Sequence, residues 1–111
     1  MEIKRRDEQG HVVLEVTGRL DASTTQEFEK SCADSITQDS CRMVLDLSGL
    51  EYISSVGLRN LLVLARKLRS GGGTLTLCNL SGIVEEVANI SGVQKIIPVF
   101  DNLENAIHSK S

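Results

Sequence analysis

The sequence is poor in aromatic residues, with no tryptophan, one tyrosine and two phenylalanines among 111 residues. Aromatic side chains stack on nucleic-acid bases and anchor many binding interfaces, so their scarcity argues against such sites. Lysine and arginine together number 12 against 15 acidic residues, and both signs are mixed along the chain. Nucleic-acid binding requires basic residues clustered without compensating carboxylates. We therefore expect no nucleic-acid partner.

Long hydrophobic runs are also missing. Apolar residues make up 41% of the chain but fall in short, separate runs, all shorter than a membrane span needs. Residues 1–7 alternate charged and apolar side chains and contain no apolar stretch of signal-peptide length. We expect a cytoplasmic protein with no membrane partner.

The cysteines give no metal or disulfide signature. Cys32, Cys41 and Cys78 are odd in number and lack the C-x-x-C spacing of metal sites, so we expect them in the core. The sequence indicates neither a metal nor another cofactor. The length is typical of one domain, and we expect a single domain over residues 1–111.

Five segments have the length and apolar pattern of β-strands: 2–6, 11–17, 43–47, 74–78 and 96–100. The first two are joined by a turn at residues 8–10. The nearly continuous apolar run at 43–47 is typical of a strand covered on both faces. Pro98 indicates an edge position for the last strand, because proline cannot donate to a strand ladder.

Four segments have helical periodicity. The first and last begin with capping-box spacing, at Ser23 with Gln26 and at Asp101 with Glu104, and a third spans residues 81–90 before Gly92. The longest, residues 55–69, ends at the glycines 71–73, and its predicted apolar face comprises Leu58, Leu61, Leu62, Ala65 and Leu68. The order β-β-α-β-α-β-α-β-α predicts an α/β fold in which four helices pack against one mixed sheet.

The stretch between the central strand and the longest helix is the most informative. We interpret residues 48–54 as a loop that brings Ser54 and Ser55 to the helix start. A helix start has unpaired N–H groups and a positive dipole, so a serine there can carry a phosphoryl group. The same serine can equally be an N-cap worth about 1 kcal/mol. Local physics leaves both interpretations open.

Residues 46–62 resemble the signature of the STAS domain family, in which a strand ending Asp-Leu-Ser precedes an aromatic or apolar pair and a serine-containing helix start closed by Gly-Leu. The resemblance continues at 18–21, 91–96 and 101–103, so it covers essentially the whole chain. It implies a single STAS-like domain acting as an anti-sigma factor antagonist. In such a partner-switching pathway, the unphosphorylated form binds an anti-sigma factor with serine kinase activity and releases the sigma factor. Phosphorylation reverses this binding, and a PP2C-type phosphatase is the implied opposing partner.

The resemblance also implies a phosphorylation site. The family's phosphorylated serine lies two positions before the glycine of the helix start, which corresponds to Ser55 and Gly57. Two positions depart from the commonest pattern: Ser54 stands where aspartate is frequent, and Val56 where serine or threonine is frequent. Ser54 is therefore a rival acceptor.

The outward side of the longest helix is the predicted docking face. Val56, Asn60, Val63 and Lys67 recur at helical spacing away from the leucine face, and Arg59 flanks them. The alternative is that the two valines lie under a neighbouring loop. The predicted partner-binding residues are Asp21, Ser54, Ser55, Val56, Gly57, Arg59, Asn60 and Val63.

The sequence leaves two alternative functions to consider. A STAS domain can instead serve as an accessory subunit or scaffold of a transporter or a stress-signalling complex. A serine hydrolase would pair Ser55 with His11 or His108, but the Gly-x-Ser-x-Gly elbow is missing because Ile53 stands where its first glycine belongs. We therefore expect a protein that is not an enzyme.

Overall fold

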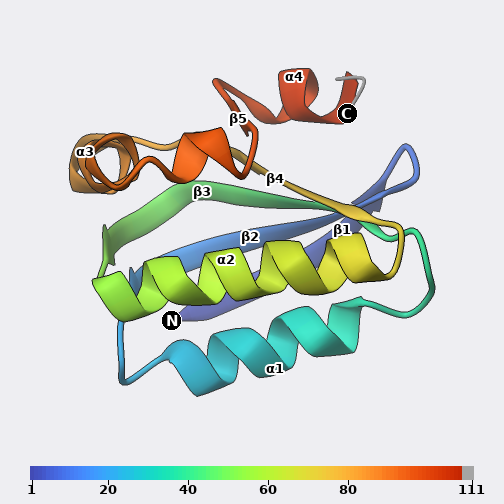
Figure 1. The fold of residues 1–111 in the computed structure, drawn as a ribbon, viewed down its shortest axis with the longest axis horizontal. Helices are drawn as coiled ribbons and strands as arrows, with labels where there is room; N and C mark the ends of the chain where they lie inside the picture. Colours follow the sequence, from blue (N-terminus) through green and yellow to red (C-terminus); the bar gives the residue numbers. More distant parts are fainter. Residues whose placement is uncertain (109–111) are drawn as a thin grey trace.

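A five-stranded mixed sheet forms the centre of the computed structural model, which describes residues 1–108 (Figure 1). Its strands lie in the sequence order β1-β2-β3-β4-β5, with β1 antiparallel to β2 and the other neighbours parallel. The strands are β1 (Glu2–Glu8), β2 (His11–Leu20), β3 (Arg42–Ile53), β4 (Thr74–Cys78) and β5 (Val99–Phe100).

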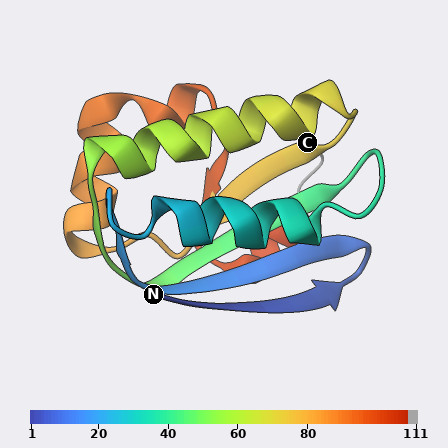
Figure 2. The same cartoon turned by 90° about the horizontal axis from the view of Figure 1, so that it is seen from below.

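Four helices pack against this sheet, and this confirms the predicted element order. They are α1 (Thr25–Ser35), α2 (Ser55–Ser70), α3 (Gly82–Ser91) and α4 (Leu103–His108), with a short 3₁₀ turn, η1 (Val93–Lys95), after α3. Figure 2 shows α1 and α2 side by side over one face of the sheet. Helix α4 packs on the opposite face, where Ala106 and Ile107 contact Val13, Val44 and Cys78. Within residues 1–108, no helix combines the length and the apolar character needed to cross a membrane.

The larger core lies between the sheet and helices α1, α2 and α3. Its fully buried side chains include Phe28 of α1, Leu61 of α2 and Ile97 after η1. All three cysteines are free and buried, as predicted. Burial raises the pKa of Cys32 and of Cys78 to about 12, so both thiols stay protonated at neutral pH.

Strand β3 is longer than the sequence predicts. It continues to Ile53, so residues 48–53 form a strand and the prediction of a loop there is wrong. Pairing with β2 continues through two irregularities of register, and the Asp46 carboxylate accepts the Ser48 N–H at 3.1 Å. A Cβ at Gly49 would lie 2.7 Å from the Thr17 hydroxyl oxygen, so a larger residue there would require the Thr17 side chain to move.

At both predicted capping boxes the helix starts one residue later than the sequence predicts, and at α1 the N-cap side chain forms no capping hydrogen bond. Helix α1 has Thr24 at its N-cap, and Ser23 instead donates its hydroxyl to the Asp21 carboxylate at 2.7 Å. At α4 the side chain of Asn102, rather than Asp101, accepts the Asn105 N–H at 2.8 Å.

The remaining differences concern the last strand and the face of α2. Strand β5 has only two residues, because Ile96 and Ile97 follow the 3₁₀ turn, but its edge position is confirmed. On α2, Leu64 is buried although the predicted face omitted it, whereas Leu58 and Leu62 are only partly buried. Leu64 turns towards α1, which a pattern within one helix cannot reveal.

Candidate functional site

The two serines lie where β3 passes into α2. The last residue of β3, Ile53, pairs with the last residue of β2, Leu20. The next backbone N–H, that of Ser54, donates to the Leu20 carbonyl at 3.0 Å. Asp21 and Ser54 therefore follow the carboxyl ends of two neighbouring parallel strands, so Asp21 lies near the start of α2.

Ser54 is the N-cap of α2. Its hydroxyl oxygen accepts the Gly57 N–H at 3.1 Å, and its backbone is extended, with φ −91° and ψ 174°. Its carbonyl accepts the Leu58 N–H at 2.9 Å. The side chain is only partly exposed, so the Ser54 hydroxyl is already used in holding the helix start.

Ser55 is the first residue of α2 and is exposed. Its hydroxyl has no hydrogen-bond partner among residues 1–108. The first turn of this 16-residue helix also contains no acidic residue, so the positive end of its dipole is not offset by a carboxylate of its own. The geometry thus gives the two serines different environments: Ser54 caps the helix, and Ser55 offers a free hydroxyl beside unpaired backbone N–H groups.

Gly57 allows the first turn of α2 to lie against the end of β2. A Cβ at this position would be 2.7 Å from the Leu20 carbonyl oxygen and 2.9 Å from Cγ1 of Ile53. Both distances are shorter than real Cβ contacts, so a side chain would push the helix start away from the sheet. The glycine expected from the STAS resemblance therefore has a steric reason at this position.

Asp21 belongs to a small polar cluster at the carboxyl ends of β2 and β3. Its carboxylate accepts the Ser23 hydroxyl and N–H, and Arg19 Nε lies 3.6 Å from its Oδ2. The Ser23 hydroxyl, the Ser23 N–H and the charge of Arg19 lower the pKa of Asp21, so the carboxylate is ionised at neutral pH. The Arg19 guanidinium also lies 4.3 Å from the centre of the Tyr52 ring, in cation–π geometry.

Sequence reasoning missed Arg19 and Tyr52. They are partners across β2 and β3. The sequence predicts Tyr52 in a loop, so the predicted elements do not bring the two residues together. A strand predicted to continue to Ile53 would have included the aromatic Tyr52 and placed it opposite β2.

The outward orientation of the two valines on α2 is confirmed. Val56 is 43% exposed and Val63 is 52% exposed, so neither lies under a loop. Asn60 and Val63 border a groove of about 170 Å³ between α1 and α2, on the side away from the sheet. Arg59 is exposed near the same end of the helix as Ser55. Val56, Arg59 and Val63 therefore lie on an accessible surface that begins at Ser55. Gly57, which the sequence also predicts to bind the partner, is buried against the end of β2, and Asn60 is only partly exposed.

Both histidines lie at the other end of the sheet. His11 begins β2, whereas Ser55 follows the end of the parallel strand β3. His108 lines a hollow with Glu8 and Gln9 of the β1–β2 hairpin. Neither imidazole is placed to accept a proton from the Ser55 hydroxyl, so the geometry gives no support to a serine hydrolase.

The mixed sheet, the capped start of α2 and the exposed serine beside the cap define a small α/β domain with a free hydroxyl where β3 passes into α2. The STAS domain family model matches residues 2–106. The chain belongs to the STAS domain family.

The chain is similar to two curated relatives in sequence and to a solved structure in fold. BtrV of Bordetella bronchiseptica, a proposed anti-sigma factor antagonist, is 38% identical over 97 residues, which are 87% of this chain and 84% of BtrV. An anti-sigma F factor antagonist of Paenibacillus polymyxa is 27% identical over 108 residues, covering 96% of this chain and 92% of the relative. The crystal structure of an anti-sigma factor antagonist from Mycobacterium paratuberculosis superposes with a TM-score of 0.85 at 26% identity, covering 96% of this chain and 90% of that chain.

Adjacent alanine substitutions test the different environments of the two serines. Ser54→Ala should lower the free energy of unfolding by about 1 kcal/mol, because the Gly57 N–H loses its acceptor. Ser55→Ala should change it by less than about 0.5 kcal/mol, because the exposed hydroxyl has no partner. Urea denaturation of both variants measures the difference. A larger loss of stability for Ser55→Ala than for Ser54→Ala would show that Ser54 is not the capping residue.

Proposed function

We propose that this chain is an anti-sigma factor antagonist that works by partner switching. Its unphosphorylated form binds an anti-sigma factor with serine kinase activity, which frees a sigma factor. Phosphorylation of Ser55 ends this binding, and a PP2C-type phosphatase restores it. The observation that carries the proposal is the exposed, unbonded hydroxyl of Ser55 next to the capping Ser54. The names of the relatives from Bordetella and Paenibacillus support the same role.

The phosphorylation step requires a base from the kinase. The bond between Ser55 Oγ and the γ-phosphorus of ATP forms as the bond from that phosphorus to the bridging oxygen of the departing ADP breaks. The hydroxyl proton passes to the kinase, because both histidines of this chain lie at the opposite end of the sheet. The chain itself supplies an accessible acceptor on a rigid helix start.

The phosphate is expected to change the surface more than the fold. It adds a charge of about −1.5 to −2 at the positive end of the α2 dipole, where an anion is favourable. Gly57 N–H is already occupied by Ser54, so the existing cap can persist. A partner that covers Ser55, however, would have to remove that charge from water, which is costly without a matching cation. Binding is therefore lost while the domain stays folded.

The docking face proposed for the partner extends from Ser55 along α2. Val56 and Val63 supply half-exposed apolar side chains, and the groove beside Asn60 can receive an apolar side chain from the partner. The amide nitrogen of Asn60 is buried without a hydrogen-bond partner within residues 1–108, so it donates to a partner atom only when the side chain turns outward on binding. Arg59 and Asp21 contribute charges of both signs at the rim.

The acceptor assignment is tested with an anti-sigma factor kinase that phosphorylates the wild-type chain. We expect wild type and Ser54→Ala each to gain one phosphoryl group, and Ser55→Ala to gain none, because the kinase reaches only the exposed hydroxyl. Intact mass and peptide fragmentation identify the modified residue. Phosphate on Ser55→Ala at the wild-type rate would refute the assignment.

A second substitution tests the docking face. Val63→Asp should weaken binding to the same anti-sigma factor at least about tenfold, because the partner would have to desolvate a carboxylate. Since Val63 is 52% exposed, the free energy of unfolding should change by less than about 0.5 kcal/mol. Gln38→Glu is the matched control: it adds the same charge on an exposed loop at the opposite end of β3. Unchanged affinity of Val63→Asp would show that the partner approaches Ser55 from another direction.

A further inference from the structure

The outer edge of the sheet is unpaired along the first half of β4. Strand β5 pairs only with Leu77 and Cys78. On that side, the Leu77 N–H donates to the Pro98 carbonyl, and the Asn79 N–H donates to the Phe100 carbonyl. Alternate residues of a strand direct their backbone groups to the same side, so Leu75 presents its N–H and C=O to this edge as well. No strand of residues 1–108 lies opposite Leu75.

Pro98 explains why β5 does not cover this position. One further step of the ladder would set the N–H of residue 98 against the Leu75 carbonyl, and proline has no N–H. Before Pro98 the chain turns into η1, with the Ile96 N–H bonded to the Val93 carbonyl at 3.0 Å. The two backbone groups of Leu75 are therefore unpaired. Leu75 is only 4% exposed, so a partner strand must displace side chains that line this edge, such as Arg69 and Ile96, to reach them.

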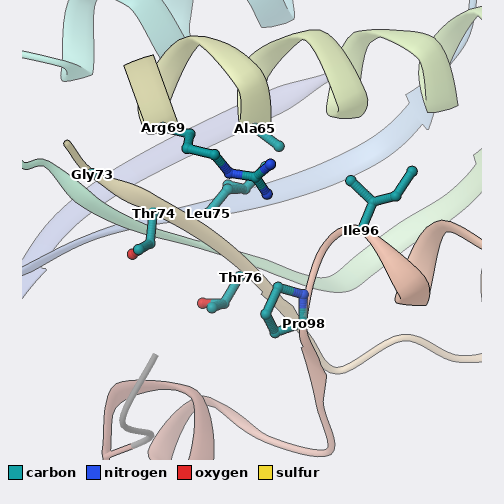
Figure 3. A pocket seen from close by; sticks show the side chains of 8 residues that line it. All are labelled: Ala65, Arg69, Gly73, Thr74, Leu75, Thr76, Ile96 and Pro98. Carbon is teal, nitrogen blue, oxygen red and sulfur yellow. The ribbon is translucent and has the colours of Figure 1, made fainter. Parts of the chain in front are cut away.

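A hollow of about 170 Å³ lies against this edge (Figure 3). Figure 3 shows Arg69 reaching from α2 over β4, with Ile96 and Pro98 on the opposite side. A second hollow of about 120 Å³ continues from it along α2 and shares Ala65, Arg69 and Ile96. We call the two together the β4-edge groove. Its lining residues are Leu62, Ala65, Arg66, Arg69, Ile96, Pro98 and residues 73–76.

The charge of the β4-edge groove is positive although the chain carries a net charge of −3. Arg66 and Arg69 form no ion pair with any carboxylate in the described part of the chain, and neither hollow is lined by an acidic residue. Ile96, which lines both hollows, is 50% exposed and gives the groove an apolar wall. The groove therefore combines unpaired backbone, apolar surface and two free guanidinium groups.

These features distinguish among possible occupants. A small carboxylate could pair with Arg69 and accept the Leu75 N–H, but it has no donor for the Leu75 carbonyl. An extended peptide brings both an N–H and a C=O to the same residue, and acidic side chains can reach the arginines. A second copy of this chain is disfavoured, because joining two such edges would bring arginines against arginines.

We propose that the β4-edge groove binds an acidic segment of a partner protein, which adds to the sheet as an extended strand beside Leu75. Arg69 lies near the end of α2, roughly 21 Å from Ser55 along the helix axis at 1.5 Å per residue. The groove is thus a second interaction surface, distant from the proposed phosphorylation site. It can hold a partner in both states of Ser55.

The test uses the ¹⁵N-labelled chain and a capped heptapeptide that alternates glutamate and valine. We expect the peptide to shift the amide resonances of Thr74, Leu75 and Ile96 in NMR titrations. Replacing both arginines, Arg66→Ala with Arg69→Ala, should weaken binding at least about fivefold, since each exposed ion pair contributes modestly. Lys4→Ala with Lys30→Ala is the control, because it removes the same charge from β1 and α1. If both double variants lose the same affinity for the peptide, the effect comes from net charge alone and the proposal is overturned.

A second peptide tests the added strand directly. In this peptide, the backbone nitrogens that would face Leu75 are methylated. Binding should weaken at least about fivefold, because the hydrogen bond from the peptide to the Leu75 carbonyl is lost. Equal affinity of the methylated peptide would overturn strand addition. If succinate displaces the peptide at similar affinity, the groove binds small carboxylates and the proposal is wrong. If sedimentation shows that the chain dimerises through this edge, the occupant is a second copy and the proposal is also wrong. Neither a kinase nor an anti-sigma factor takes part, so failure here leaves the Ser55 proposal intact.

Discussion

The close approach of α2 to the end of β2 is the constraint on which the site depends. The Leu20 carbonyl accepts the Ser54 N–H, and Gly57 leaves no Cβ to strike that carbonyl from the first turn of the helix. With the helix start held there, the Ser54 hydroxyl is directed to the Gly57 N–H and becomes the cap. Ser55 then faces outward. Because of this one backbone contact, Ser54 has a structural role and Ser55 stays accessible.

Helix α2 connects two surfaces with different physical properties. At its start, a neutral hydroxyl, half-exposed valines and unpaired helix N–H groups form a surface whose charge a single phosphate can reverse. At its end, fixed arginines and an unpaired strand edge form a surface that phosphorylation does not alter. Because the helix is rigid and packed on the core through Leu61 and Leu68, the two surfaces keep a constant separation. Such an arrangement allows one partner to be switched while another stays bound.

The sequence predicts what local periodicity and composition determine. The element order, the buried cysteines, the edge position after Pro98 and the outward valines of α2 are all confirmed. What it misses depends on contacts between distant residues. Strand β3 extends through Ser48 and Gly49, where β2 pairs with it, and the Asp21 carboxylate binds the N–H and hydroxyl of Ser23 one residue before the N-cap of α1. The Arg19–Tyr52 contact likewise exists only once those two strands are aligned.

The central claim is that a phosphate on Ser55 acts on the interface and leaves the fold intact. The most direct measurement compares the phosphorylated and unphosphorylated chain by calorimetry, for both binding to the anti-sigma factor and thermal unfolding. The account predicts a dissociation constant at least about tenfold higher for the phosphorylated chain, or about 1.4 kcal/mol. It also predicts melting temperatures within about 2 °C of each other, corresponding to well under 1 kcal/mol. Equal affinities, or a loss of affinity accompanied by a marked fall in melting temperature, would contradict it.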